Sequence, residues 1–188
     1  MRLDEVSREF GITCSGGKRA RSDATCVVIH QTGGATARGA ASYLSTRPDG
    51  SVHIIVDDTE AYLTAPISRI ACGVKDVNAW TVHIEQAGPF SWRISDWKKH
   101  WRTVRRCAWH TARYLVILNE PRRSLSIADL NRGQRHGWTT HRNLTYSTAS
   151  SSTHVDPVRY AYPLFKLYLR KFYRRFEKNG VPPLKKVA

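Results

Sequence analysis

The sequence lacks the features that would send a protein into or across a membrane. Its 188 residues contain no apolar run of about 18, the length needed to cross a bilayer. The opening residues, MRLDEVSREFGITCSGGKRARS, contain no apolar core of a signal peptide. We therefore expect neither a membrane span nor a secretory signal.

Cysteines and acidic residues are both scarce. The four cysteines show no Cys-x-x-Cys spacing, which argues against a zinc ribbon and predicts a reduced compartment. They are Cys14, Cys26, Cys72 and Cys107. Asp and Glu number 15 against 30 Lys and Arg, so the formal net charge is +15. Such an excess favours a polyanionic partner, either nucleic acid or an anionic cell envelope.

Motifs typical of nucleic-acid binding are also missing. There is no glycine-rich phosphate loop, no helix-turn-helix and no aromatic RNA-binding signature. The positive charge gathers in two segments: residues 93–123 hold nine Lys or Arg against two acids, and residues 159–186 hold nine against Glu177 alone. Solvated helix faces would explain these segments equally well, so charge by itself leaves both interpretations open.

Hydrophobic residues make up 41% of the chain, enough for a folded core. Short β-branched runs predict strands, and apolar residues at helical spacing predict helices. The expected strands are 26–30, 52–56, 61–64, 81–86 and 137–141. The expected helices are 35–45, one long helix from an N-cap at Ser95 to 118, one from Pro163 to 179, and a short one near 3–10. This alternation predicts an α/β fold, with a single mixed central β-sheet flanked by helices.

Two polar segments carry candidate chemistry. In CVVIHQTGG, residues 26–34, a buried strand ends in His30 and a glycine turn. In HRNLTYSTASSSTHVDP, residues 141–157, two histidines and an aspartate share a loop, and Pro157 restrains Asp156 to an extended backbone. A strand-end histidine, a second histidine and a carboxylate suit a zinc site whose fourth position is left for water. The alternative is a set of incidental polar residues at the core edge and on a surface loop.

Six segments, in order, resemble the zinc-dependent N-acetylmuramoyl-L-alanine amidases of type 2, a family that includes phage endolysins and the peptidoglycan recognition proteins. VVIHQTGG resembles the family's IHHTGG, and SVHIIVDD its SAHYVVD. RIACG falls where the family often has AWHAG, and NAWTVHIEQAG resembles NxxSIGIELxG. GWTTHRNL and STHVDP resemble GHxDI followed by THTDPG. TVHIEQAG and STHVDP are most similar to endolysins of phages that infect actinobacteria.

The resemblance implies a role for individual residues. His30, His141 and Asp156 match the three zinc ligands. Glu85 matches the acidic residue that handles the proton of the zinc-activated water, and His154 matches the position of the group that stabilises the oxyanion. The implied reaction is hydrolysis of the amide bond between N-acetylmuramic acid and L-alanine in bacterial peptidoglycan.

The remaining histidines and the departures from the family pattern support weaker expectations. His53 and His83 could line the cleft or support a ligand from behind. The other three histidines are expected at the surface or the core edge; they are His100, His110 and His136. Gln31 replaces the second histidine of IHHTGG, from which little follows. Cys72-Gly73 stands where relatives have histidine, so the cleft wall is expected to differ.

The resemblance also implies an organisation and a context. We expect an N-terminal extension at 1–24, an amidase domain at 25–178 that includes the basic C-terminal helix, and a short tail at 179–188. A monomer made in the host cytoplasm would act on the wall after release, with the basic helices able to bind anionic envelope polymers. Two alternatives are a non-catalytic peptidoglycan-binding protein of the same fold and, less favoured, a basic nucleic-acid-binding protein. The complete ligand set and Glu85 favour the enzyme.

Overall fold

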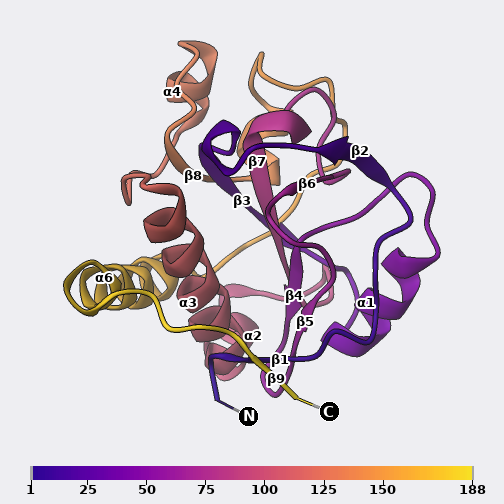
Figure 1. The fold of residues 1–188 in the computed structure, drawn as a ribbon, viewed down its shortest axis with the longest axis vertical. Coiled ribbons are helices and arrows are strands. Elements are labelled where there is room, and N and C mark those ends of the chain that lie inside the picture. Colours follow the sequence, from indigo (N-terminus) through magenta and orange to yellow (C-terminus); the bar gives the residue numbers. More distant parts are fainter. Residues whose placement is uncertain (1, 188) are drawn as a thin grey trace.

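A five-stranded mixed β-sheet forms the centre of the molecule in the computed structural model, which describes residues 2–187 (Figure 1). The strand order is β5-β4-β7-β3-β8, in which β5 runs antiparallel to β4 and the other pairs are parallel. The strands are β3 (Cys26–Gln31), β4 (Ile54–Val56), β5 (Ala61–Leu63), β7 (Thr81–Gln86) and β8 (Gly137–Thr140). The predicted mixed α/β architecture is confirmed.

Helices cover both faces of this sheet. α3 and α6 lie side by side on one face, and α1 lies on the other (Figure 1). The helices are α1 (Ala37–Ser45), α2 (Ile94–Lys99), α3 (Trp101–Leu118), α4 (Ile127–Asn131), α5 (His141–Thr145) and α6 (Tyr162–Asn179), with short 3₁₀ turns at Arg21–Asp23 and Asn78–Trp80. Within residues 2–187, no helix combines the length and apolar character needed to span a bilayer.

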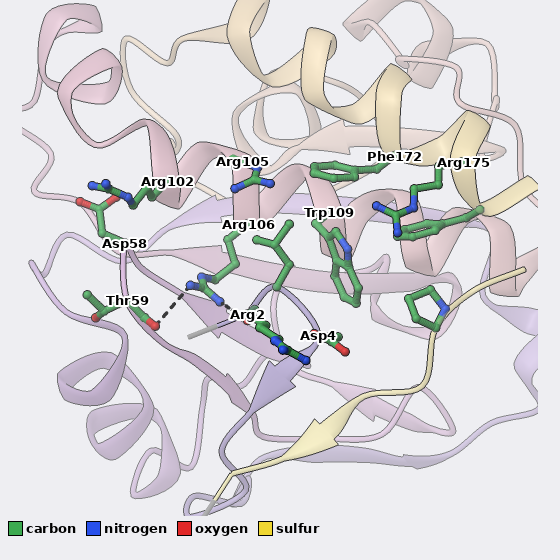
Figure 2. Close-up of a pocket in the computed structure, with 13 residues that line it drawn as sticks. Arg2, Asp4, Asp58, Thr59, Arg102, Arg105, Arg106, Trp109, Phe172 and Arg175 are labelled. Atoms are coloured by element: carbon green, nitrogen blue, oxygen red, sulfur yellow. Dashed lines mark hydrogen bonds between the residues drawn. The ribbon is translucent and has the colours of Figure 1, made fainter. Parts of the chain in front are cut away.

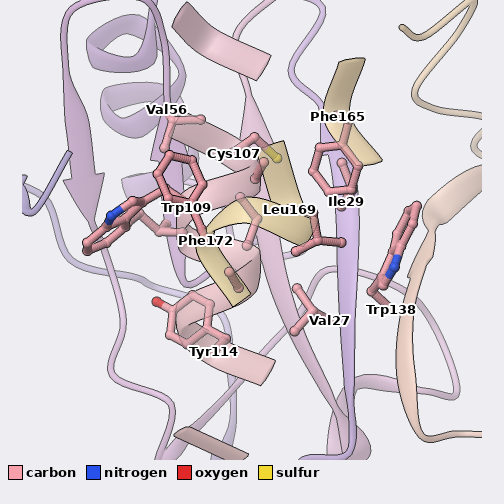
Figure 3. Packing of buried hydrophobic residues seen from close by; sticks show 14 of the residues in the cluster. Val27, Ile29, Val56, Cys107, Trp109, Tyr114, Trp138, Phe165, Leu169 and Phe172 are labelled. Carbon is pink, nitrogen blue, oxygen red and sulfur yellow. The ribbon is translucent and has the colours of Figure 1, made fainter. Parts of the chain in front are cut away.

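The main core lies between the sheet and the α3–α6 pair (Figure 3). Val27 and Ile29 of β3, together with Val82 and Ile84 of β7, are fully buried on that side. Side chains alternate between the two faces of a strand. His30, His83 and Glu85 therefore belong to the opposite face, beyond the reach of α3.

The prediction of one long helix from Ser95 to 118 is wrong. The helix is interrupted at His100, which separates α2 from α3. Asp58, from the loop after β4, accepts hydrogen bonds from the Thr103 backbone and hydroxyl, both at 2.9 Å. This carboxylate satisfies amide groups in the first turn of α3 and so favours a new helix start there. Arg93, not Ser95, is the N-cap of α2.

The expected helix near residues 3–10 is also wrong. Its residues instead form β1 (Glu5–Val6), which pairs in parallel with β9 (Lys185–Lys186). Further along, β2 (Ser15–Lys18) pairs antiparallel with β6 (Arg69–Ala71). Both segments outside the proposed 25–178 domain thus take part in strand pairing, and the boundaries themselves stay a prediction.

The expectation that the cysteines are reduced is wrong for one pair. Ser15 lies opposite Ala71 in the β2–β6 ladder, so the next positions along, Cys14 and Cys72, face each other. Their Cα atoms are 5.9 Å apart and the sulfurs form a disulfide. The other two cysteines, Cys26 and Cys107, are free and buried.

His110 also contradicts its expected place at the surface or core edge. It is fully buried on α3, and neither ring nitrogen has a hydrogen-bond partner among the described residues. Burial lowers the pKa of this imidazole well below its usual range, so the ring is neutral. His100 and His136 instead lie beside carboxylates, those of Asp58 and Glu120.

Candidate active site

Three elements bring a histidine, a second histidine and an aspartate together. His30 lies near the end of β3, His141 begins α5 directly after β8, and Asp156 precedes α6. Each is at most 4% exposed. One ligand atom from each side chain can be chosen so that all three lie within 4.8 Å of one another. Parallel strands place their carboxyl ends at one edge of the sheet, which is why His30 and His141 meet although 111 residues apart (141 minus 30).

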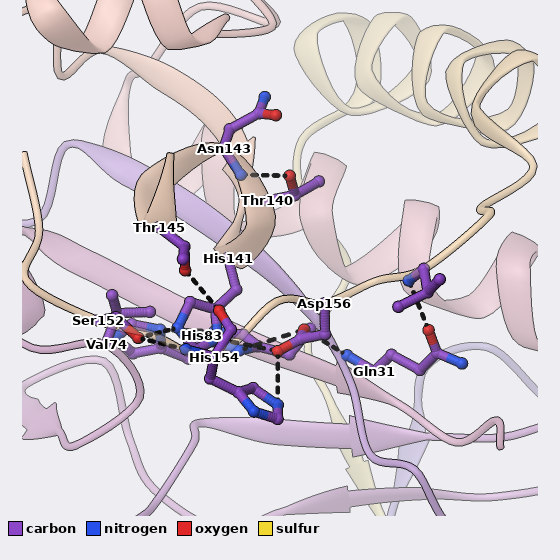
Figure 4. A network of polar contacts seen from close by, with 12 residues as sticks. Gln31, Val74, His83, Thr140, His141, Asn143, Thr145, Ser152, His154 and Asp156 are labelled. Carbon is purple, nitrogen blue, oxygen red and sulfur yellow. Dashed lines mark hydrogen bonds and ion pairs between the residues drawn. The ribbon is translucent and has the colours of Figure 1, made fainter. Parts of the chain in front are cut away.

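His30 and His141 both turn Nδ1 toward the Asp156 carboxylate. Figure 4 shows this contact for His141. His141 Nδ1 is 2.9 Å from Oδ2, and His30 Nδ1 is 3.7 Å from Oδ1. Burial lowers the pKa of His30 to about 3, whereas the carboxyl pKa of Asp156 is lowered because hydrogen bonds with His141 and His154 outweigh its burial. A neutral histidine and an ionised carboxylate are the forms that bind metal.

His83 determines which nitrogen of His30 carries the proton. The Thr81 hydroxyl donates to the Val77 carbonyl at 2.9 Å, so it accepts from His83 Nε2, also at 2.9 Å. His83 Nδ1 is then an acceptor, and His30 Nε2 donates to it at 3.0 Å. The chain of donors leaves the lone pair of His30 on Nδ1, facing Asp156.

Gly73 makes room for this arrangement. A Cβ at Gly73 would lie 2.5 Å from the His83 ring, closer than real Cβ contacts. His53 lies one step further from the ligands and is fully buried, so it does not line a cleft. Its Nδ1 accepts the backbone N–H of His83 at 3.0 Å. His53 therefore holds the β7 backbone, and His83 holds the ligand.

Ser152 and Gln31 have roles that the sequence did not reveal. The Ser152 hydroxyl is 2.7 Å from His141 Nε2 and so supports the second ligand from behind. Gln31, from which little was expected, is 1% exposed and joins two loops. The side-chain Nε2 of Gln31 donates to the Gly88 carbonyl at 3.0 Å, and its Oε1 accepts from the Val158 backbone N–H at 2.8 Å. The backbone N–H of Gln31 also donates to Asp156 at 2.8 Å, which orients that carboxylate.

Glu85 lies opposite His30 in the parallel register of β3 and β7. Neighbouring strands are about 4.8 Å apart, so two side chains on the same face are adjacent. The Glu85 atom Oε2 is buried and has no hydrogen-bond partner among the described residues. Burial, and then the charge of Asp156, raises the pKa of Glu85 well above its usual range. A shifted carboxyl of this kind is suited to taking up and returning a proton.

A groove of about 200 Å³ opens beside Glu85, lined by the turn after β3 and by α1, including Gly34, Ala40 and Tyr43. Tyr43 is 60% exposed and gives the groove an apolar wall. His154 places Nε2 3.2 Å from Asp156 Oδ2. Its ring is partly exposed and packs edge-on against Phe90. Glu85 and His154 thus each lie beside one member of the cluster, Glu85 beside His30 and His154 beside Asp156.

The donor set suits a metal ion. Two imidazole nitrogens and one carboxylate oxygen, buried and held from behind by His83, Ser152 and Gln31, match a catalytic site with three protein ligands. The unpartnered Glu85 oxygen lies on the same face of the sheet. The arrangement could hold a metal and perform metal-assisted hydrolysis.

A sequence profile of the N-acetylmuramoyl-L-alanine amidases matches residues 20–158. The chain belongs to this family. Its activity is hydrolysis of the amide between N-acetylmuramic acid and L-alanine, and peptidoglycan is its substrate. No curated relative matches the chain.

Solved structures of low sequence identity share the fold. The Staphylococcus aureus hydrolase AmiA, in complex with its ligand, is 19% identical, with a TM-score of 0.67 over 94% of this chain and 88% of that one. The PlyG catalytic domain is 16% identical, with a TM-score of 0.57 over 97% and 99%. The endolysin amidase LysCS from Clostridium intestinale URNW is 11% identical, with a TM-score of 0.52 over 88% and 95%.

Proposed function

We propose that the chain is a zinc-dependent endolysin amidase that cleaves peptidoglycan during host lysis. The proposal is carried by one observation: a buried His30–His141–Asp156 cluster with Glu85 beside it on the adjacent parallel strand. His30, His141 and Asp156 would hold the zinc. When bound, zinc polarises the scissile carbonyl and makes water a stronger acid at neutral pH.

Glu85 is the proton carrier in this proposal. Its carboxylate takes a proton from the attacking water and delivers it to the departing nitrogen of L-alanine. Its raised pKa, which results first from burial and then from Asp156, favours holding that proton between the two transfers. The apolar groove beside Glu85 offers a place for part of the substrate.

His154 stabilises the oxyanion of the tetrahedral intermediate. A hydrogen bond to Asp156 raises the pKa of His154, which favours its protonated form. A protonated, partly exposed imidazole beside the ligands can donate to the developing negative charge. One such donor is worth about 10²–10³ in rate.

The wider context follows from the endolysin assignment. The chain is made in the cytoplasm of a host cell, works as a monomer built on the 25–178 amidase domain, and reaches the wall after release. The similarity to the LysCS endolysin amidase supports this context. The +15 charge supports contact of the basic helices with anionic envelope polymers.

Metal analysis combined with digestion of purified sacculi tests the proposal. We expect about one zinc per chain. Digestion should free the amino groups of L-alanine without creating new reducing sugars. Chelation should stop this release, and added zinc should restore it. Release that continues undiminished in metal-free protein would rule out the zinc mechanism.

A further inference from the structure

Figure 2 shows a second cavity, of about 640 Å³. Its lining residues Trp109, Phe172 and Phe176 belong to the core on the α3 side of the sheet, opposite to the candidate catalytic residues. The N-terminal segment, α3 and α6 enclose it, and it shares no residue with the candidate active site. Five arginines and no lysine line it: Arg2, Arg102, Arg105, Arg106 and Arg175. A volume of this size is in the range of ligand pockets, about 300–1,000 Å³.

The two carboxylates in the lining are occupied elsewhere. Asp4 lies 3.5 Å from Lys185, and Asp58 binds Thr103 and His100. Arg102, Arg105 and Arg175 form no ion pair within residues 2–187: no carboxylate oxygen lies within 4 Å of their guanidinium nitrogens. The lining of the cavity therefore holds more arginines than carboxylates, and three of these arginines have no ion-pair partner among the described residues.

Arg106 forms the buried wall of the cavity. It is 3% exposed, yet its guanidinium binds backbone carbonyls instead of a carboxylate. These are the carbonyls of Asp57 and Arg2, at 3.1 Å, and of Thr59, at 3.3 Å. A buried cation without a counter-ion is unfavourable, and a nearby anion would relieve it.

The chemistry of the lining suits an anion with paired oxygen atoms. Guanidinium groups form paired, parallel hydrogen bonds with phosphate and with carboxylate, which a lysine ammonium cannot reproduce. Trp109 and Phe172 add aromatic rings to the same wall, and the Arg105 guanidinium lies 5.9 Å from the Phe172 ring centre. A phosphodiester chain offers both kinds of contact, oxygens for the arginines and carbon atoms for the rings.

We propose that this cavity binds the phosphodiester backbone of an anionic wall polymer. The proposal rests on the proposed function, because that function places the chain at the bacterial wall. A polymer held behind the sheet would leave the catalytic face free to meet peptidoglycan. Nucleic acid offers the same phosphodiester, but the chain lacks nucleic-acid recognition motifs, so the wall polymer is the favoured ligand.

The full-length chain and soluble poly(glycerol phosphate) provide the test. Arg102, Arg105 and Arg175 are reversed together to Glu. The matched control reverses Arg170, Lys171 and Arg174, which are exposed on α6, lie outside the cavity and change the net charge by the same amount. Because the cavity variant loses hydrogen bonds from charged groups, it should bind at least about tenfold more weakly. The control should lose clearly less than the cavity variant, since exposed charges on α6 are screened by water and salt.

Two single substitutions test the proposal even if the triple variant fails to fold. Arg174 and Arg175 are exposed neighbours on α6, and only Arg175 lines the cavity. Arg175→Glu should weaken binding more than Arg174→Glu does. All variants should hydrolyse a small soluble muramyl-peptide at the parental rate, which separates failure of this site from failure of the amidase assignment.

Three results would overturn the proposal. Equal losses in the cavity and control variants would reduce the effect to net charge. Tighter binding of polyglutamate than of poly(glycerol phosphate) would remove the preference for phosphate. Tighter binding of duplex DNA through the same arginines would assign the cavity to nucleic acid instead of a wall polymer.

Discussion

Both faces of the central sheet are buried, but one is held by apolar packing and the other by hydrogen bonds between polar side chains. Toward α3, Ile29 and Ile84 are fully buried among apolar neighbours. On the opposite face, His30 and His83 are 2% and 0% exposed, yet their nitrogens need partners. Apolar packing tolerates substitutions that conserve volume, whereas a buried polar group fails when one partner is lost. Adjacent residues of one strand should therefore respond to mutation in different ways.

The largest contrast is expected between His30 and Ile29. His30→Ala should abolish metal binding and amidase activity, because one of three ligands is removed. Ile29→Val should keep both and lower the free energy of unfolding by about 0.5–1.5 kcal/mol. Metal content, sacculus digestion and denaturant unfolding measure these effects. A His30→Ala chain that retained its metal would exclude His30 as a ligand.

The next pair, on β7, separates rate from stability. Ile84→Ala should lower the free energy of unfolding by about 2–5 kcal/mol, with little change in the rate of the folded enzyme. Glu85→Gln should keep fold and metal and lose on the order of 10²-fold in rate, as expected for a missing general base. Denaturant unfolding and single-turnover kinetics distinguish the two. Near-normal turnover of Glu85→Gln would mean that another group carries the proton.

His83 tests whether the polar face depends on partners behind the ligands. His83→Ala removes the acceptor for His30 Nε2 and should weaken metal affinity by about 10–100-fold. His83→Gln retains an acceptor and a donor, so it should recover part of that loss. Affinity is measured by competition with a chelator, independently of catalysis. Unchanged affinity in His83→Ala would remove His83 from the support of the site.

The smallest effect is expected at Asp58, behind the apolar face. Asp58→Asn weakens the cap of α3 and should lower the free energy of unfolding by about 1 kcal/mol. Burial alone would raise the pKa of the Asp58 carboxyl, but hydrogen bonds from His100 and Thr103 outweigh burial and lower it. A lowered folded-state pKa stabilises the fold above the ordinary carboxyl pKa of about 4.

The Asp58 contribution should therefore be lost as the pH falls through the folded-state pKa. The difference between parent and Asp58→Asn should be larger near pH 5 than below about pH 4. Urea unfolding of both chains across this range measures it. A difference that grows toward low pH would contradict the role of the ionised carboxylate.

Sequence patterns predicted the strands and helices that are determined by neighbouring residues in the chain. β3 and β7 lie within one residue of their expected ranges because runs such as CVVI and TVHI specify a buried strand directly. The break at His100 was missed because its cause, Asp58, lies 42 residues away. The Cys14–Cys72 disulfide was missed for the same reason, since it follows from a strand pairing that spans 58 residues.

The candidate site likewise contains residues that the sequence indicated and residues that it did not. The resemblance to the amidases named His30, His141 and Asp156, and the structure brings them together, although composition and spacing alone left incidental histidines as an alternative. Gln31 and Ser152 carried no signal, because a glutamine after a strand and a serine in a serine-rich loop are ordinary residues. Their importance comes from contacts with loops up to 127 residues away.

Gly73 restricts the order in which neighbouring substitutions could accumulate. Any side chain there would begin with a Cβ 2.5 Å from the His83 ring, so a chain with alanine at 73 has no room for histidine at 83. In this fold, glycine at 73 therefore has to be in place before a histidine at 83 can reach His30.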